Sequence, residues 1–456
     1  MLLLFLLVAA YISIVGIYSA TGFILLIILL FGLIASLLFF QLGHRVHWAL
    51  LLVIISVTVN GTRFGLPVTP DGLLVPFLTV VLLLSVPARF ARVRSYPLFL
   101  PVCGFVLVNF AASFLISPVR SLSVHQSLIF VSRALTFFVV VIAVQSNPAL
   151  RSRLPQYLLL LLLIHTIISL VALSVVHFIL TPFIVYGQDG SSSVSINGFF
   201  LEPNLFAIFV LCVIALFLPI ALFSRTKHRI KISISIIIGL IGLVLSYTRS
   251  SWIGFIVVVS CLVLCTFGRP GKKIRNSVVM LVAFLALLVS LFLSGLFVLD
   301  SLGIQSNLAH RFTAILDQNS DSARQRTGTW RAALGEWQSH KWLGTGPLSF
   351  VAAAPSSKGW LFSSVVQTLH DSGLIGTFCM LWLCGGAIRY AWRAYYAARN
   401  DQDKAIALGY VLAQVALFFT SQFSSFFWGG FAWLLLGLAV GHSTIILNQR
   451  TNLATA

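Results

Sequence analysis

LLLLLLIHTIISLVALSVV (residues 158–176) and VVMLVAFLALLVSLFLSGLFVL (residues 278–299) are nearly continuous apolar runs. Each is long enough to cross the ~30 Å hydrocarbon core of a bilayer as an α-helix. Because hydrocarbon offers no water to backbone groups, only helices and closed β-barrels can span it. A barrel would show short segments of alternating polarity instead. The two runs therefore predict a helical membrane protein.

Composition extends this prediction to most of the chain. Of the 456 residues, 59% are hydrophobic and only 9% are charged, whereas soluble domains contain about 25% charged residues. Residues 1–18 lack a charged start and a polar cleavage site, so we expect an uncleaved first span. The six cysteines all fall in apolar runs, where packing is their expected role. We predict no cofactor and no metal site.

Hydropathy predicts an all-α bundle of about 12–14 spans. The fourteen candidate spans are 2–18, 21–40, 47–60, 72–87, 97–116, 124–145, 156–178, 205–223, 232–247, 251–267, 277–298, 366–388, 405–420 and 427–447. The chain then divides into four parts. They are an N-terminal bundle (1–195), transmembrane helices with polar motifs (196–298), a large extracytoplasmic loop (299–365) and C-terminal transmembrane helices (366–456).

The charged residues predict the orientation of the bundle. With these spans, the loops on one side carry 19 Lys and Arg against two acids, and Arg389, Arg393 and Arg399 are among them. An excess of Lys and Arg marks the cytoplasmic side, so we expect a multi-pass protein with both termini in the cytoplasm. The net charge of +19 therefore indicates contact with anionic membrane lipids and does not indicate a nucleic-acid partner.

The loop 299–365 is far longer than the other connections, and long loops are commonly functional. Within it, Trp330, Leu334 and Trp337 recur at helical spacing between charged residues. This pattern is typical of an amphipathic helix lying on the membrane surface. A simple lid packed on the bundle is the alternative interpretation.

Several arginines are predicted on the outer side. Arg311, Arg326 and Arg331 lie in the long loop, and Arg249 lies in a hairpin between two apolar spans. Guanidinium presents a rigid donor fork that matches phosphate, so we predict that Arg249 and Arg326 bind pyrophosphate with help from Arg311 and Arg331. Snorkelling to lipid headgroups is the alternative for each of them, and we put function first only for Arg249 and Arg326.

Arg133 lies two to three turns inside a predicted span. An ionisable residue inside the membrane is by default a candidate for function. A buried structural pair with Glu202 or Asp189 is the other interpretation.

A pyrophosphate group at an outer membrane surface suggests a polyprenyl-linked sugar as donor. Displacement at the anomeric carbon needs cations to stabilise the leaving group and a base to deprotonate the acceptor hydroxyl. The candidate bases on the outer side are His370, Asp371, Glu202 and His310. A lipid-pyrophosphate donor does not need the metal motif of nucleotide-sugar enzymes.

Four motifs then occur in a recognisable order within residues 195–380. They are GFFLEPNLFA (198–207), LSYTRSS (245–251), RTGTWRAAL (326–334) with HKWLGTGPLSF (340–350), and LHDSGLIG (369–376). In this order the chain resembles the O-antigen ligase/polymerase superfamily. The resemblance implies a GT-C-like bundle in the bacterial cytoplasmic (inner) membrane and a metal-independent glycosyltransferase of surface polysaccharide or lipopolysaccharide biosynthesis. The implied donor is a glycan on undecaprenyl or another polyprenyl pyrophosphate, and the acceptor is a glycan or a lipid.

Two positions depart from the superfamily pattern. Ser195 stands where ligases often carry Arg, and Phe362 stands where they usually carry His. The reaction of a ligase and that of a polymerase therefore both stay open. We expect Asn204 to cap the helix after Pro203. We expect the glycine pair Gly344 and Gly346 to form a turn.

Two other classes of protein are alternatives to an enzyme. A transporter or lipid-linked glycan flippase also has many spans, but internal repeats and charges at the membrane midplane are typical of that class, and the polar residues here gather at one surface. A non-catalytic assembly partner would not need the outer arginines.

Overall fold

The computed structural model describes residues 96–146, 148–174, 184–186, 194–200, 202–224, 228–267, 321–353, 361–425 and 429–454, with a few positions between 54 and 79. Its helices are α6 (Phe99–Leu115), α7 (Arg120–Ser146), α8 (Pro148–Ser174), α9 (Pro203–Phe223), α10 (Arg229–Leu245), α11 (Arg249–Phe267), α14 (Asp321–Trp337), α15 (Ser349–Ala353), α16 (Ser364–Ala397), α17 (Asp401–Thr420) and α18 (Gly430–Ala454). The strands β1 (Ile184–Tyr186) and β2 (Val194–Ile196) pair antiparallel, which the sequence did not predict.

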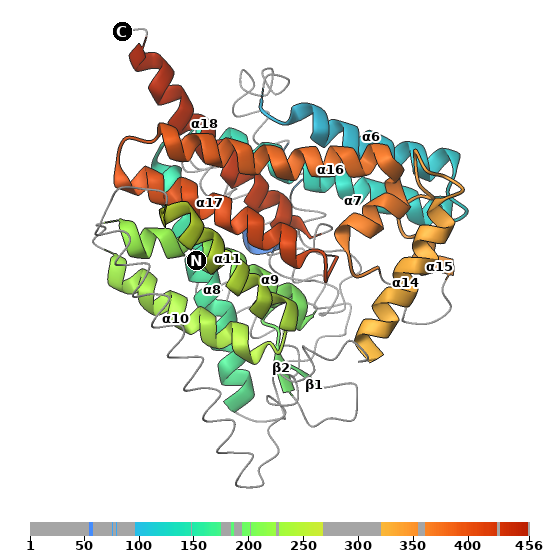
Figure 1. Cartoon of the computed structure of the whole chain (residues 1–456), viewed down its shortest axis with the longest axis horizontal. Coiled ribbons are helices and arrows are strands. Elements are labelled where there is room, and N and C mark those ends of the chain that lie inside the picture. Colours follow the sequence, from blue (N-terminus) through green and yellow to red (C-terminus); the bar gives the residue numbers. More distant parts are fainter. Residues whose placement is uncertain are drawn as a thin grey trace, which may run out of the picture.

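The long helices form a bundle (Figure 1). Among the described helices, α7, α9, α11, α16, α17 and α18 are long and apolar enough to cross a membrane. α16 packs against α6 and α17, while α9 packs against α17 and α10. The predicted class, a polytopic helical membrane protein, is confirmed.

The predicted spans agree with the helices wherever the structure describes them. The predicted spans 97–116, 124–145, 156–178, 205–223, 232–247, 251–267, 366–388, 405–420 and 427–447 each overlap one described helix, namely α6, α7, α8, α9, α10, α11, α16, α17 and α18 in that order. The spans 2–18, 21–40, 47–60, 72–87 and 277–298 lie largely outside the described residues. α16 continues to Ala397, beyond its predicted end, because its last turns contain Arg and Tyr that hydropathy alone leaves out. The division into four parts stays a prediction.

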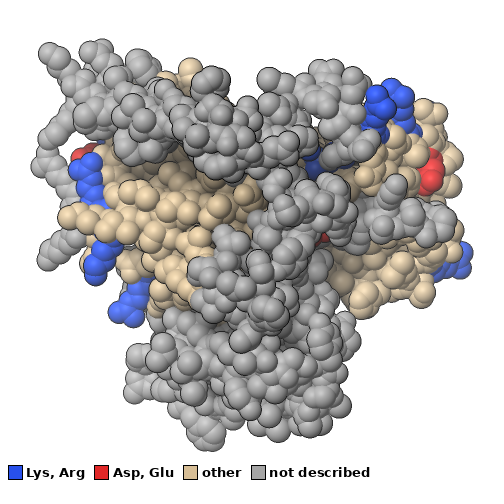
Figure 2. Space-filling view, turned by 90° about the horizontal axis from the view of Figure 1, so that it is seen from below, with Lys and Arg blue, Asp and Glu red and all other residues tan. Residues whose placement is uncertain are grey.

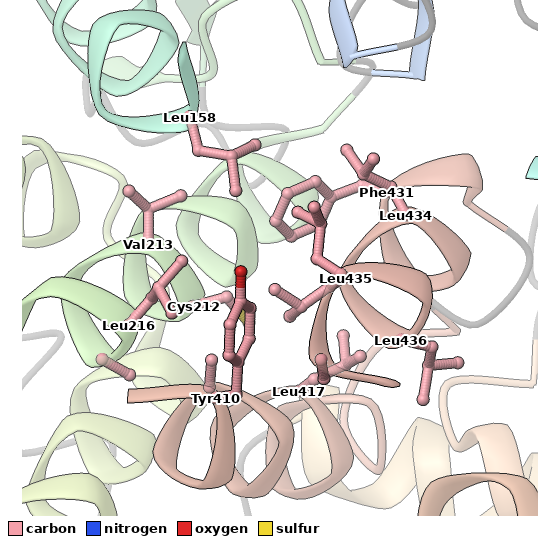
Figure 3. Close-up of a cluster of buried hydrophobic side chains, with 14 of the residues drawn as sticks. Leu158, Cys212, Val213, Leu216, Tyr410, Leu417, Phe431, Leu434, Leu435 and Leu436 are labelled. Atoms are coloured by element: carbon pink, nitrogen blue, oxygen red, sulfur yellow. The ribbon is translucent and has the colours of Figure 1, made fainter. Parts of the chain in front are cut away.

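The centre of the bundle is built around α9, whose residues from Phe206 to Ala221 are all buried. A helix that is apolar on every side needs neighbours on every side. Figure 3 shows side chains of α8, α9, α17 and α18 meeting there, with Cys212 among them. Gly409 of α17 allows the closest approach, because a Cβ at this position would lie 2.1 Å from the carbonyl oxygen of Leu216.

α16 is broken at Gly373, whose φ of 64° and ψ of −162° are not helical. The segment 341–346 forms hydrogen bonds with the backbone groups that the break leaves without helical partners on both of its sides. The amides of Thr345 and Gly346 donate to the carbonyls of His370 and Asp371 at 2.8 and 3.0 Å, and the amide of Leu374 donates to Lys341 at 2.9 Å. Membrane proteins tolerate a broken helix where protein groups replace the lost hydrogen bonds.

Glycines make this junction possible. Gly344 and Gly346 have φ of 73° and 92°, as expected for the predicted turn. A Cβ on Gly373 would lie 2.3 Å from the carbonyl carbon of Trp342, and a Cβ on Gly344 would lie 2.5 Å from the carbonyl oxygen of His370. The segment after α14 is therefore tied directly to the backbone of α16.

On the face in Figure 2, the charged side chains of the described residues lie mostly towards the two ends of the long axis. Such a distribution suits helices that cross a bilayer along that axis, because charges inside the hydrocarbon are costly. The cytoplasmic side and the location of the two termini stay predictions.

Candidate functional site

Two of the sequence motifs meet at the N-terminal ends of α9 and α11. The hydroxyl of Thr248 donates to the side-chain oxygen of Asn204 at 3.3 Å. Arg249 follows Thr248 and begins α11, while the exposed Glu202 directly precedes α9. This contact places Glu202 and Arg249 in the same part of the molecule.

The predicted role of Asn204 as a helix cap is wrong. The residue at the cap position is Glu202, and its side chain makes no capping hydrogen bond. Pro203 takes the first helical position, which its fixed φ favours, so the helix begins earlier than we expected. Asn204 instead connects α9 to the residue before α11.

The segment before α9 is fixed on α8. The amide of Phe199 donates to Nδ1 of His165 at 3.1 Å, and the amide of Gly198 donates to the hydroxyl of Ser169 at 2.9 Å. Gly198 has a φ of 56°, and a Cβ there would lie 2.8 Å from Nδ1 of His165. Glu202 therefore follows an anchored segment.

Arg326 of α14 lies near Arg249. Burial lowers the pKa of the Arg326 guanidinium, and the positive charge of Arg249 lowers that pKa further. The guanidinium stands over the ring of Phe362, 5.1 Å from the ring centre, in cation–π geometry. The two guanidinium groups repel each other, and an anion bound between them would offset this repulsion. Phe362 is the residue at the position where the superfamily usually has His.

A second polar group surrounds His370 at the start of α16. One ring nitrogen of His370 lies 3.0 Å from a carboxylate oxygen of Glu336, and the other lies 2.9 Å from Asp371. The hydroxyl of Thr345 lies 3.1–3.2 Å from both nitrogens, and Phe350 packs edge-on against the ring. His370 is 1% exposed and Asp371 5%, whereas Glu336 is 47% exposed. This group joins α14 to α16.

The two polar groups are separated along α14. Arg326 and Glu336 are ten residues apart, which corresponds to about 15 Å along a helix. The structure therefore brings Arg249 and Arg326 together but does not bring His370 and Asp371 to them.

The remaining candidates take different places. Arg331 is exposed on α14, and Arg133 is buried in α7. Arg311, His310 and Asp189 lie outside the described residues.

α14 occurs where the amphipathic helix was predicted. Among its described residues Ala333 is the buried one, and it packs with Phe350 and Leu361 beside Trp330. Leu334 is 36% exposed and takes no part in this packing. Glu336 is one of the charged residues between the aromatic positions, and its contact with His370 was not predicted. Its spacing of three residues from Ala333 was the available signal, because positions three apart share a helix face.

Fold and site together define a polytopic membrane protein in which Arg326 of α14 lies near Arg249 at the start of α11. Residues 234–381 match the family model described as O-Antigen ligase. The matched range includes most of α10, all of α11, α14 and α15, and the first half of α16, and so contains Arg249, Arg326 and His370. The match over these residues confirms the resemblance to the O-antigen ligase/polymerase superfamily. No curated protein matched the chain.

Proposed function

We propose that this protein is a metal-independent glycosyltransferase that ligates or polymerises a polyprenyl-pyrophosphate-linked glycan at the outer face of the cytoplasmic membrane. The proximity of Arg249 and Arg326 supports this proposal most directly. The two residues come from different helices, and α14 is otherwise mostly exposed. Two guanidinium groups suit a pyrophosphate, and the match to the O-antigen ligase family model supports glycan transfer in general.

In the proposed reaction, the oxygen of an acceptor hydroxyl attacks the anomeric carbon of the donor sugar. The bond from this carbon to the pyrophosphate oxygen breaks, and the polyprenyl pyrophosphate leaves with the electron pair. Arg249 and Arg326 stabilise the charge that develops on the leaving group. Arg331 is exposed on the same helix as Arg326 and, with Arg311, assists in binding the donor.

The acceptor proton needs a base that the hydroxyl can reach. Glu202 is exposed and lies two residues before Asn204, which contacts the residue before Arg249. His370 and Asp371 are enclosed, and both ring nitrogens of His370 face carboxylates. Of the candidate bases that the structure describes, we therefore assign this role to Glu202. His370, Asp371 and Glu336 position α14, and through α14 they position Arg326.

The test uses purified protein in lipid nanodiscs with a polyprenyl-pyrophosphate oligosaccharide and an acceptor. We expect Arg249→Ala and Arg326→Ala each to lower the transfer rate by about 10²–10³-fold, the usual cost of removing one stabilising donor. Arg324→Ala is the matched control, because Arg324 is exposed on the same helix. Mass spectrometry of the products measures transfer. Full transfer by both variants, or translocation of the donor without a glycosidic product, would contradict the proposal.

Comparing surface glycans with and without the protein separates the two reactions. Loss of polymer length indicates a polymerase. Intact polymer that stays on the lipid carrier indicates a ligase.

A further inference from the structure

A cavity of about 590 Å³ lies between the start of α6 and the C-terminal half of α16. Leu100, Trp382, Gly385, Arg389 and Arg393 are among the residues that line it. It is at the other end of α16 from His370. The proposed glycan-transfer site therefore does not use it.

Two adjacent glycines, Gly385 and Gly386, shape this cavity because they carry no side chain. A Cβ at Gly385 would meet no atom within 4 Å, so the space above it is empty of described side chains. A Cβ at Gly386 would lie 2.3 Å from a methyl carbon of Leu98, so this glycine lets the segment before α6 approach α16 closely. Larger residues at these two positions would fill the cavity or separate its walls.

The polar lining of the cavity is cationic. Arg389 and Arg393 are both exposed and stand four residues apart, on one face of α16. Tyr390 lines the same cavity and adds a hydroxyl. Neither arginine forms an ion pair with a carboxylate of the described residues. This arrangement of donors fits a phosphate group.

The wall that continues from the cavity along α16 is apolar and exposed. Trp382 is 45% exposed, Phe378 is 62% exposed and packs against it, and Leu100 of α6 is 68% exposed. In the other direction, Trp392, Tyr395 and Tyr396 contact one another. Clustered Trp and Tyr are typical of the level where bilayer meets water. The cavity thus presents cations at the headgroup level and apolar surface towards the hydrocarbon.

We propose that this cavity binds an anionic phospholipid of the leaflet that the charge pattern predicts to be cytoplasmic. Arg389 and Arg393 hold the lipid phosphate, and the acyl chains lie along Trp382, Phe378 and Leu100. Free phosphate would leave this apolar wall unused, so the ligand is amphipathic. The bound lipid bridges α6 and α16, which both line the cavity. This inference does not depend on the proposed glycan transfer.

Native mass spectrometry of the delipidated full-length protein tests the proposal. The probes are phosphatidylglycerol, phosphatidylcholine and polyprenyl phosphate at equal concentrations. We expect preferential binding of phosphatidylglycerol. The double variant Arg389→Ala/Arg393→Ala should weaken this binding about 30-fold, given the contribution of each cation near a membrane surface. Arg399→Ala is the matched control, because Arg399 is exposed just beyond α16 and does not line the cavity.

A second variant tests the cavity with the arginines in place. Gly385→Leu places a side chain in the open space and should also weaken binding of phosphatidylglycerol, with an unchanged size-exclusion profile showing that the protein is folded. Three results would overturn the proposal. They are wild-type binding by the double variant, an equal loss in Arg399→Ala, and tighter binding of polyprenyl phosphate than of phosphatidylglycerol.

Discussion

The helix α9 is buried along almost its whole length, whereas Ala333 is the one fully buried side chain among the described residues of α14. α9 is placed by apolar contacts on all sides. α14 is placed by a few specific contacts, namely Arg326 with Phe362, Glu336 with His370, and Ala333 with Phe350 and Leu361. Nonspecific packing therefore builds the scaffold, and directional polar contacts set the position of the helix that carries the proposed site.

If this contrast is correct, adding an atom at the closest contact between α17 and α9 should lower the free energy of unfolding more than any other substitution proposed below. Gly409→Ala puts a Cβ against the carbonyl of Leu216, a backbone atom that cannot move aside. We expect a loss of about 1–3 kcal/mol in the free energy of unfolding, as for other overpacked sites. Thermal unfolding in detergent measures this loss. Wild-type stability would show that α9 and α17 are less closely packed than described.

The polar contacts of α14 should affect the reaction more than stability. His370→Ala releases α14 from α16, and we expect the KM for the donor to rise about tenfold, a change of 1.4 kcal/mol. Loss of a general base would instead lower kcat by about 10²–10⁴-fold. Steady-state kinetics separates the two results.

The matched variant for this contact is Glu336→Gln, whose amide can still hydrogen-bond to His370. Its KM for the donor should stay within about threefold of wild type, because the hydrogen bond to His370 remains and, as a neutral bond, still contributes about 1 kcal/mol. A large fall in kcat in either variant would indicate a direct role of His370 in the reaction and would contradict its assignment as a positioning residue.

The ring under Arg326 should have a smaller effect. Phe362→Leu keeps an apolar side chain but removes the aromatic face, and a cation–π contact at a partly exposed site is worth about 0.5–1 kcal/mol. We expect the KM for the donor to rise about threefold with kcat unchanged. Phe362→Tyr, which keeps the ring, is the control and should behave as wild type.

The smallest effect is expected on the open side of α14. A Cβ at Gly328 would meet nothing within 4 Å, so Gly328→Ala should raise helix stability by at most about 1 kcal/mol, the difference in helix propensity. In the same unfolding assay, replacing glycine with alanine should therefore lower the stability at Gly409 and raise it at Gly328. If both substitutions destabilised the protein, the proposed difference in packing between α9 and α14 would be wrong.

Much of the scaffold was predictable from the sequence because hydropathy is a local property. Each described span was predicted from its own residues, and Arg249 stood out because it lies between two apolar spans. The turn at Gly344 and Gly346 was also predicted from its residues, since few others adopt a positive φ.

The tertiary structure decided which of these residues meet. Asn204 contacts Thr248, His370 contacts Glu336, and α16 breaks at Gly373 to accept the segment after α14. These contacts join segments far apart in the chain, and they depend on the rotation of each helix about its axis. Hydropathy fixes that rotation only for a helix with one apolar face, which the uniformly apolar α9 lacks. For α14, hydropathy does not reveal which polar side chain meets which partner.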